Sequence, residues 1–450
     1  MKRIYSIKII CITIWLLLFS NSNATNFEKR FNASILETDV LVVGGGTAGT
    51  IAAIQSARLG VKTTLIESGS QLGGTTTTGG VAFPGLFHAW GEQIINGIGW
   101  ELVSEAVKLN SDTLPDFKIP TGKSHWKHQI PINTYLYTLI AEEKAMKAGV
   151  SIRYYETPVE VIRKGDYWYT KIVGKGTVCT IKSKQIIDCT GNASITALAG
   201  YKLLQDNETQ PGSLIFELEG YDYSKLEEKD LQKRYGEALK NKIILKTDAY
   251  NGIKALLTAR SGISVQHIIN ASSASSVLHT QSNIAGRESL LRVLRFVRTF
   301  PGCENAKIKI MQTETAIRET CRIEGEYQIT VEDYTSGRVF EDALSYSFYP
   351  IDLHVEGGVK PKHLQEGVVA TIPLRALIPK NSMNFIVAGR CLSSDRLSNS
   401  ALRVQASCMG MGQSAVVVAA LACKYNTTPL KVPLAEIKKT LKEQGCIVPK

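Results

Sequence analysis

The sequence predicts an α/β fold in which a parallel sheet is interrupted twice, once by a β-meander and once by an inserted α+β domain. Three observations support this prediction. A buried strand runs into a glycine turn and a helix over 39–60, the apolar period changes to two over 151–184, and a charged segment with mixed helix and strand patterns fills 213–372. Because 450 residues exceed what one hydrophobic core usually holds, we expect two domains.

The stretch from Thr38 to Glu67 has the pattern of strand, glycine turn, helix and strand. The glycines that follow Val43 have the spacing G-x-G-x-x-G. In a dinucleotide-binding turn, the first glycine permits the tight bend, the second lets the backbone approach a pyrophosphate, and the third brings the helix onto the strand. Glu67 ends the next strand, where a carboxylate can accept hydrogen bonds from ribose hydroxyls. The pattern predicts a Rossmann-like site whose turn residues are Gly44, Gly46, Thr47, Ala48 and Gly49.

Two further loops are expected beside this turn. The first contains Leu72–Gly80, whose glycines and threonines disfavour a helix and suit a backbone pressed against a flat ligand. A flexible linker is the alternative for this loop. The second follows the buried strand Gln185–Cys189, because ligands bind at the carboxyl ends of such strands. The loop residues that we assign to the ligand are Ser68, Gly73, Gly74, Thr75, Thr78, Thr190 and Gly191.

The first 24 residues have the pattern of a secretory signal peptide. Three basic residues precede an apolar core at 9–19, and Ser22–Ala24 is a small-residue cleavage site. An uncleaved membrane anchor is the alternative, although the core is short for a bilayer span. Removing 1–24, which hold three basic and no acidic residues, lowers the formal net charge from +11 to +8. We expect an exported protein, periplasmic in a bacterium or secreted, with a solvated basic surface and no nucleic-acid site.

The nine cysteines include no C-x-x-C pair. Their spacing fits neither an iron–sulfur cluster nor a structural zinc, so we predict no metal site. Several lie in apolar contexts, where buried free thiols are the expected state. A redox pair of Cys391 and Cys408 is the alternative.

The nucleotide-binding domain is expected in two parts. In its second part, the strand Phe385–Ala388 and the turn Gly389–Arg390 precede Gly412 and Gln413, which we place at the start of an apolar helix over 414–423. A helix start offers free N–H groups and a positive dipole end to an anionic ligand. The expected division is a signal peptide (1–24), a first nucleotide-binding part (36–212, with the meander at 151–184), a substrate-covering domain (213–372), a second nucleotide-binding part (373–425) and a tail (426–450).

The chain resembles the FAD-dependent oxidoreductase family related to heterodisulfide reductase A-like flavoproteins and, more distantly, to fumarate reductase flavoproteins. Five motifs support this resemblance. In the order given in the next sentence, the first is common to many flavoproteins, and the last two are specific to this family. The matching motifs are Gly44–Gly49 with Glu67, Leu72–Thr75, Ile187–Asn192, Arg318–Tyr327, and Ile372–Pro379 with Val387–Arg390 running to Gly410–Gln413.

The resemblance implies a glutathione reductase-type domain that binds FAD in an extended form. Gly44–Gly49 would hold the pyrophosphate and Glu67 the adenosine ribose, while the Gly73–Thr78 loop and Gly389–Arg390 would lie near the flavin. A helix start at Gly412–Gln413 would face the negative charge of the reduced flavin. The resemblance does not extend to the iron–sulfur cysteine motifs of heterodisulfide reductase, which this sequence lacks.

The function that we expect is an exported FAD-dependent oxidoreductase. It would transfer a hydride between flavin N5 and a small organic acid, alcohol or sugar. A histidine bonded to backbone carbonyls, or an arginine paired to Asp395, is the structural alternative for each candidate catalytic residue. His88 is a position to check for a covalent flavin link. The candidate proton-moving and anion-holding residues are His354, Arg375, Arg390 and Arg403.

Two other classes of function stay open. A non-catalytic exported binding protein would keep the fold without turnover, and a cluster-linked redox subunit would contain iron. For the oxidoreductase, the expected partners are a small-molecule substrate and an electron donor or acceptor. Only one full dinucleotide fingerprint is present, so a second nicotinamide site is not predicted.

Overall fold

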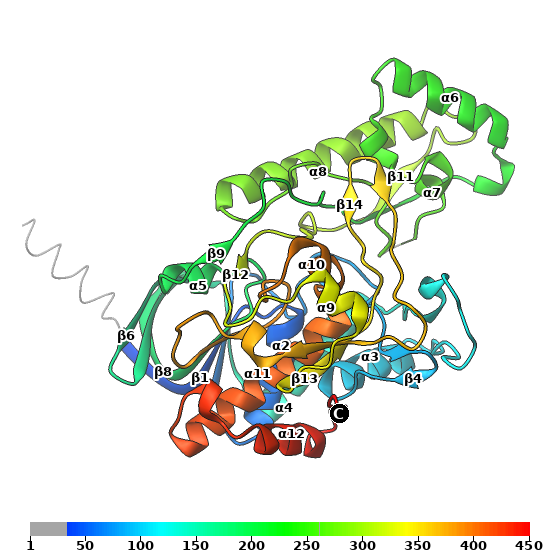
Figure 1. Cartoon of the computed structure of the whole chain (residues 1–450). Coiled ribbons are helices and arrows are strands. Elements are labelled where there is room, and N and C mark those ends of the chain that lie inside the picture. The colour runs from blue at the N-terminus through cyan, green and yellow to red at the C-terminus, as the bar shows by residue number, and fades with distance from the viewer. Residues whose placement is uncertain (1–33, 261) are drawn as a thin grey trace, which may run out of the picture.

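The computed structural model describes residues 34–260 and 262–450, so the predicted signal peptide lies outside the described residues. A larger body contains a sheet covered by helices, and a smaller body projects from one side of it (Figure 1). The smaller body, called the cap below, consists of β10 (Phe216–Glu219), α6 (Glu228–Lys240), α7 (Ile253–Leu257), α8 (Ser276–Val297) and β11 (Lys307–Met311).

The larger body is built on a seven-stranded sheet. Its strands are β1 (Ser34–Val43), β2 (Thr63–Glu67), β5 (Ser151–Tyr154), β6 (Glu156–Lys164), β7 (Tyr167–Gly174), β8 (Thr177–Asp188) and β17 (Phe385–Val387). Five of them lie in the order β5-β2-β1-β8-β17 and run parallel. The first half of β8 also pairs with β7, which pairs in turn with β6, both antiparallel. The predicted α/β fold with a Rossmann-like parallel sheet is confirmed.

Side chains alternate between the two faces of the sheet, as the pleat of a strand requires. Along β1, Val40 and Val42 belong to the core under the helices, while Leu41 and Val43 belong to the core under the meander and α5 (Ser194–Leu198). A strand buried on both faces therefore appears in the sequence as a continuous apolar run. The helices of the first face are α2 (Thr47–Arg58), α3 (Ile98–Leu109), α4 (Thr134–Ala148), α11 (Gln405–Tyr425) and α12 (Leu434–Glu443).

The meander differs from the prediction at both ends. We predicted that 151–155 belong to the meander, but β5 pairs parallel with β2 and is the outer strand of the nucleotide-binding sheet. The sequence also separated 177–181 from 185–189, whereas both belong to the single strand β8. Lys182 and Lys184 broke the apolar pattern there, and they pair with Glu37 and Asp39 at the surface while the backbone ladder continues between them.

The predicted substrate-covering domain over 213–372 is too long. The separate core of the cap is formed by residues within 214–306. Leu344, Ala370 and Ile372 instead pack into the helix-side core of the larger body. The chain therefore leaves the cap well before 372, because the strands that contain these residues pair with each other over the larger body and not with β10 or β11.

The remaining elements are short and connect these layers. The strands are β3 (His88–Ala89), β4 (Glu92–Gln93), β9 (Leu203–Leu204), β12 (Arg322–Ile323), β13 (Ala343–Ser347), β14 (His354–Val355), β15 (Gly358–Val359) and β16 (Ala370–Pro373). The helices are α9 (Val331–Ser336) and α10 (Arg396–Leu402), with 3-10 turns η1 (His125–His128), η2 (Tyr223–Lys225), η3 (Lys246–Ala249), η4 (Leu374–Leu377) and η5 (Pro429–Lys431).

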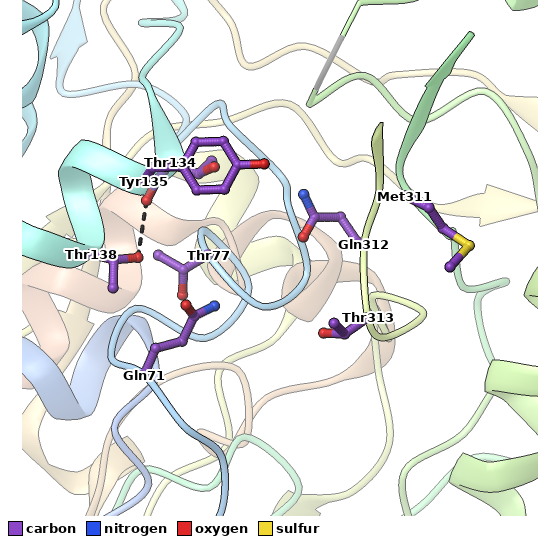
Figure 2. Close-up of a pocket in the computed structure, with 8 residues that line it drawn as sticks. All are labelled: Gln71, Thr77, Thr134, Tyr135, Thr138, Met311, Gln312 and Thr313. Carbon is purple, nitrogen blue, oxygen red and sulfur yellow. Dashed lines mark hydrogen bonds between the residues drawn. The ribbon is translucent and has the colours of Figure 1, made fainter. Parts of the chain in front are cut away.

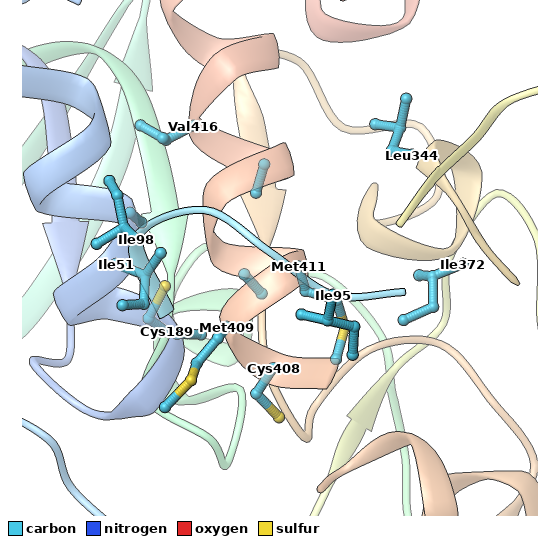
Figure 3. Close-up of a cluster of buried hydrophobic side chains, with 14 of the residues drawn as sticks. Ile51, Ile95, Ile98, Cys189, Leu344, Ile372, Cys408, Met409, Met411 and Val416 are labelled. Carbon is cyan, nitrogen blue, oxygen red and sulfur yellow. The ribbon is translucent and has the colours of Figure 1, made fainter. Parts of the chain in front are cut away.

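Helix α11 passes through the centre of the larger body. Figure 3 shows its Met411 and Val416 among side chains that include Ile51 of α2 and Ile98 of α3. Of the described helices, α11 alone has the length and apolar composition of a membrane span, and 89% of its apolar window is buried inside the fold. Burial of this kind is typical of a core helix.

The predicted helix start at Gly412–Gln413 is wrong. Helix α11 begins at Gln405, so both residues lie inside it. A Cβ added to Gly412 would lie 2.2 Å from the carbonyl oxygen of Ala48, which shows that α11 touches α2 backbone to backbone. The Gln413 amide accepts a hydrogen bond from the N–H of Ile98 and donates one to Gln55. Both residues join helices, and neither offers a free helix terminus to a ligand.

We expect Gly412→Ala to lower the free energy of unfolding by about 1–3 kcal/mol, because the added methyl group meets backbone that cannot rotate away. The matched control is Gly236→Ala in α6, where an added Cβ has nothing within 4 Å. That substitution should be neutral or stabilising by up to about 1 kcal/mol, since alanine is the better helix former. Urea denaturation followed by circular dichroism measures both, and equal effects would contradict this account of Gly412.

Candidate functional site

The turn between β1 and α2 is shaped by two glycines. Gly44 has a φ of +97°, and a Cβ on it would lie 2.6 Å from the carbonyl oxygen of Cys189 at the end of β8. A Cβ on Gly49 would lie 1.8 Å from the carbonyl oxygen of Gly44. Only glycine fits at these two positions, and the turn is therefore pressed against the neighbouring strand end.

Gly46 differs from its neighbours, because its Cβ direction is open. The nearest atoms to an added Cβ, on Cys189 and Gly74, lie 4.0 Å away. Gly46 is the N-cap of α2 and has no side chain to cap it, and the first turn of the helix contains no acidic residue. Free N–H groups of Thr47 and Ala48 and the positive end of the helix dipole therefore border an open space, which suits an anion such as a pyrophosphate.

The second predicted loop lies directly against this turn. The N–H of Gly73 donates to the carbonyl oxygen of Gly45 at 2.8 Å, and the Thr47 hydroxyl donates to Gly73 at 3.3 Å. A Cβ on Gly74 would lie 2.7 Å from Cα of Gly46. Within the loop, the carbonyl of Thr75 accepts from Val81, and the Thr78 hydroxyl accepts from Gln71. These contacts show a fixed loop, not the flexible linker that the sequence left as an alternative.

Glu67 ends β2 beside the turn. Its carboxylate accepts the N–H of Gly45 at 2.7 Å and the N–H of Gly69 at 2.6 Å, and the Ser68 hydroxyl donates to it at 3.2 Å. The residue is only partly buried. A partly exposed acceptor at this edge of the sheet is what a ribose diol requires.

The ends of β8 and β17 complete this edge of the sheet. Asp188 accepts hydrogen bonds from the N–H and the hydroxyl of Thr190. Arg390, which follows Gly389, donates to the carbonyl oxygen of Gly191 at 2.6 Å and to that of Ile317 on the segment after β11. The guanidinium of Arg390 thus ties the two strand ends to the base of the cap.

Two residues singled out in the sequence are engaged in contacts with other side chains. Arg375 is at the surface, with 45% of its side chain exposed, paired to Asp342 and placed over the ring of Tyr327. Its prediction as an anion-holding residue is therefore wrong. His88 stacks on Phe117 with ring centroids 3.7 Å apart, and burial lowers its pKa to about 4.

His354 and Arg403, in contrast, are brought together. The Nε2 atom of His354 lies 3.2 Å from a carboxylate oxygen of Asp352, and a guanidinium nitrogen of Arg403 lies 3.8 Å from the same oxygen. His267, from the cap, joins them with its Nε2 atom 2.9 Å from Nδ1 of His354. Tyr250 stacks on the ring of His267 at 3.8 Å between centroids. This set is called the junction cluster below.

Arg318 is the second cation of the junction cluster. Its guanidinium donates to the carbonyl oxygen of Pro211 and to the hydroxyls of Ser213 and Ser264, all of which are uncharged. Within residues 34–260 and 262–450, no carboxylate lies at ion-pair distance from it. Burial and the nearby charge of Arg403 lower its pKa to about 10. Of the two guanidinium groups, Arg403 alone lies at ion-pair distance from Asp352, while Arg318 acts on this carboxylate only through its charge.

The charges of the junction cluster act on one another. Burial raises the pKa of Asp352, but the hydrogen bond from His354 and the charges of the two arginines outweigh it, so this pKa lies below its usual value. Burial and the charge of Arg318 lower the pKa of His354 to about 4 and that of His267 to about 3. At neutral pH the carboxyl group is therefore ionised and both imidazoles are uncharged.

Two chain segments connect the junction cluster to the loops at the sheet edge. Arg318 follows Ile317, whose carbonyl binds Arg390, and a Cβ on Gly79 would lie 3.4 Å from Ala316. Arg403 comes just before Gln405, whose side chain bonds Thr76 and the carbonyl oxygen of Val81. Residues one or two positions from Arg318 and Arg403 along the chain therefore contact the loop that follows Glu67 or the turn at Arg390. These contacts place the junction cluster close to that loop.

A small pocket opens at the same boundary between loop and cap. Its volume is about 220 Å³. Figure 2 shows Thr77 and Gln71 of the loop facing Thr134 and Tyr135 at the start of α4, with Gln312 reaching in from the cap side. All of the residues that line it are uncharged, so it differs in character from the junction cluster.

Arg318 and His267 are among the residues of the junction cluster that sequence reasoning missed. Arg318 begins one of the motifs on which the family resemblance rests, and an arginine at that position is the signal that could have identified it. His267 has no such signal, because it lies in a loop without a recognisable motif. It is brought to His354 only by the hairpin of β14 and β15, which reaches toward the cap (Figure 1).

A family model described as FAD dependent oxidoreductase matches residues 39–441. The chain belongs to the FAD-dependent oxidoreductase family. FAD is accordingly its cofactor, and the oxidoreductase class that the sequence predicted is confirmed.

Individual relatives of this FAD-dependent oxidoreductase are similar over shorter stretches. The digeranylgeranylglycerophospholipid reductase of Methanocaldococcus jannaschii is 28% identical over 165 residues, which is 36% of this chain and 41% of that protein. A dihydrolipoyl dehydrogenase of Staphylococcus aureus is 34% identical over 87 residues, 18% of each chain. This chain therefore spans less than half the length of both relatives.

Solved structures match over more of the chain but less closely. A geranylgeranyl bacteriochlorophyll reductase-like protein from Thermoplasma acidophilum has a TM-score of 0.41 and 14% identity, covering 91% of this chain and 84% of that one. The p-nitrophenol 4-monooxygenase of Pseudomonas putida has a TM-score of 0.39 and 13% identity, covering 90% and 82%. Nothing about the reaction follows from these two similarities.

The residues at the sheet edge fit FAD. The uncapped start of α2 and the open Cβ direction of Gly46 leave room for a pyrophosphate. Glu67 would offer a carboxylate to the adenosine ribose, and the loop from Gly73 and the turn at Gly389 are the residues that the family resemblance assigns to the flavin. Among the residues that the structure describes, no group of three or more His, Cys, Asp or Glu side chains could hold a metal ion, and the eight cysteines are unpaired.

We expect Gly46→Ala to fold normally and to lose at least tenfold in FAD affinity, since the methyl group has room in the protein alone but projects where the pyrophosphate would lie. Gly44→Ala is the contrasting variant and should be destabilised, because of its positive φ and its contact with Cys189. The ratio of flavin to protein absorbance and the melting temperature measure the two effects. Full flavin content in Gly46→Ala would place the pyrophosphate elsewhere.

Proposed function

We propose that this chain is an exported FAD-dependent oxidoreductase that oxidises or reduces a small organic anion at the junction cluster. The family membership supports the cofactor and the class of reaction. The sequence motifs support a place in the branch related to heterodisulfide reductase A-like flavoproteins, and the pattern of residues 1–24 supports export.

The charge balance of the junction cluster is the observation that favours an anion. Arg318 bonds only to neutral oxygen atoms, while Asp352 lies at ion-pair distance from Arg403. A partly buried guanidinium without its own carboxylate is costly unless an anion completes the site. The planar donors of arginine match a carboxylate, which makes a small organic acid the favoured substrate class.

Each group then has a defined task. FAD supplies hydride donor or acceptor chemistry when bound. Arg318 and Arg403 bind the carboxylate of the substrate and orient its reacting carbon. Asp352, with 18% of its side chain exposed, is the group of the Asp–His pair that can reach the substrate and exchange a proton with it. His354 cannot do so directly, because both of its ring nitrogens are engaged.

This geometry revises the role that the sequence gave to His354. The sequence suggested it as a base acting on the substrate. In the structure it lies between Asp352 and His267, so we assign it to the support of Asp352. Arg390 binds two backbone carbonyls and is assigned to the connection of strand ends, not to catalysis.

An absorption spectrum of the purified protein, before and after denaturation and filtration, is the first test. A flavin that passes the filter establishes non-covalent FAD, and an anaerobic screen of organic acids, alcohols and sugars for flavin bleaching then tests the substrate class. Bleaching by uncharged compounds alone would contradict the anion proposal. A flavin that no donor or acceptor changes would favour the non-catalytic binding protein, and stoichiometric iron would favour the cluster-linked redox protein.

We expect Arg318→Gln to raise the KM for the anionic substrate about 10- to 100-fold, which corresponds to the roughly 1.5–3 kcal/mol of a hydrogen bond to a charged group. The control is Arg375→Gln, which removes an exposed arginine already paired with Asp342 and should leave KM unchanged. Anaerobic bleaching rates over a range of substrate concentrations give the comparison. A similar KM in both variants would remove Arg318 from the binding site.

A further inference from the structure

Exposed apolar side chains gather in one stretch of the larger body, between the end of α3 and the end of α4. In the part of the chain that the structure describes, eight large apolar residues are at least 59% exposed, and six of them lie within 109–146. These six are Leu109, Ile119, Trp126, Tyr135, Leu139 and Met146. The other two, Ile35 and Val277, lie far apart in the chain. An exposed apolar surface of this kind marks a place of contact with another apolar surface.

The loop between α3 and α4 is fixed so that its apolar tips stay outside. Phe117 packs among aromatic rings at one end of the loop, and Ile130 is completely buried in the helix-side core at the other. Two successive turns, closed by backbone hydrogen bonds, shorten the segment 121–127 between them. Because both ends are held by packing, Ile119 and Trp126 project from the loop and remain in water.

The lysines of this loop have no carboxylate partner. Lys118, Lys123 and Lys127 are all exposed, and within residues 34–260 and 262–450 none of them forms an ion pair. The sequence contains no Asp or Glu from 117 to 141. Lys144 of α4, in contrast, is paired with two glutamates of α3. The loop therefore joins apolar tips to an uncompensated positive charge, which is complementary to a surface that is both apolar and anionic.

We propose that this loop docks on an anionic lipid surface, with Ile119 and Trp126 inserted at the level of the headgroups and the three lysines held against lipid phosphates. Tryptophan suits the membrane interface, because its large ring is apolar and its N–H is polar. The negative surface potential of anionic lipids attracts the neighbouring lysines. Ile119 favours lipid over a soluble polyanion, which would attract the lysines but leave this side chain in water. Binding with so few inserted groups is reversible and sensitive to salt.

The inner side of the same loop reaches the segment that leads into the junction cluster. The ring of His125 lies against that of Tyr349, with centroids 5.1 Å apart, and the Gln129 amide donates to the Tyr349 hydroxyl at 2.8 Å. Tyr349 comes shortly before Asp352 in the chain. A protein bound to lipid through this loop therefore has the junction cluster close to that surface. Docking does not depend on the reaction at the cluster, because it uses only the outer face of the loop.

The direct test is co-sedimentation of the FAD-loaded protein with vesicles of phosphatidylcholine, with or without phosphatidylglycerol. The protein used lacks residues 1–24, because the apolar core of the predicted signal peptide would bind vesicles by itself, and residues 25–450 include all that the structure describes. We expect binding to the vesicles that contain phosphatidylglycerol. The apparent affinity should fall about tenfold or more between about 0.1 M and about 1 M sodium chloride, where the screening length shortens from about 10 Å to about 3 Å.

Two variants of the loop separate apolar insertion from charge. Ile119→Ser combined with Trp126→Ser should weaken binding about tenfold or more at both salt concentrations, because salt does not screen the insertion of apolar side chains. Lys118→Gln, Lys123→Gln and Lys127→Gln together should weaken it about 100-fold at the lower salt concentration, since each lysine contributes roughly a factor of five. The lysine variant should also lose most of the salt dependence. The melting temperature and the flavin absorbance show whether each variant keeps its fold and cofactor.

The matched control is Ile243→Ser combined with Leu245→Ser, in the turn after α6. This turn also places two exposed apolar side chains beside two exposed lysines, Lys242 and Lys246, but it has no aromatic residue. Because it lies in the cap and not in the loop, the control variant should bind vesicles like the unchanged protein.

Vesicle binding that survives in both loop variants, or that falls only in the control variant, would overturn the proposal. It would also be overturned if the substitutions of Ile119 and Trp126 had no effect and the protein bound dextran sulfate as tightly as vesicles, because the loop would then recognise charge alone. A dimer detected by light scattering without lipid, and lost when Ile119 and Trp126 are replaced, would assign the surface to a second copy of the chain instead.

Discussion

The close contact between the β1–α2 turn and the end of β8 is the constraint on which the rest of the structure depends. Because Gly44 and Gly49 carry no side chains, the turn lies against Cys189 and the start of α2 points over the sheet edge. Helix α2 in turn meets α11 backbone to backbone at Gly412. The position of α11 fixes its first residue, Gln405, against the loop after Glu67, and so places the preceding Arg403 at the junction with the cap.

The same arrangement explains why two kinds of chemistry lie side by side. The sheet edge presents backbone N–H groups and an uncapped helix, which suit the phosphates and ribose of FAD. The junction cluster presents side-chain cations around one carboxylate. The segments after β11 and before α11 link the two sets, and Asn192 after β8 also donates to the carbonyl oxygen of Ser273. The junction cluster, unlike the sheet edge, needs the cap to supply His267.

Local features made the first set predictable from sequence. The glycine spacing, the apolar strands and Glu67 lie within 30 residues of one another, and each has a steric or electrostatic reason. Gly412 and Gln413 were misplaced because α11 begins with polar and small residues from Gln405, which concealed its first turns. His267 could not be found, since its contact with His354 joins residues 87 positions apart. Arg375 illustrates the opposite error. It lies in a motif of the resemblance, but no sequence pattern reveals that it pairs with Asp342 at the surface.

The junction cluster contains buried polar groups that lower the stability of the folded chain, and this loss of stability is informative about function. Arg318 without a carboxylate, and a histidine nitrogen without a donor, both lower the stability of the chain by itself. Such groups persist when a ligand or a reaction uses them. The small organic anion that we propose as substrate would satisfy the first. The bonding of Arg318 to neutral oxygen atoms is thus the feature of the junction cluster that the proposed substrate explains.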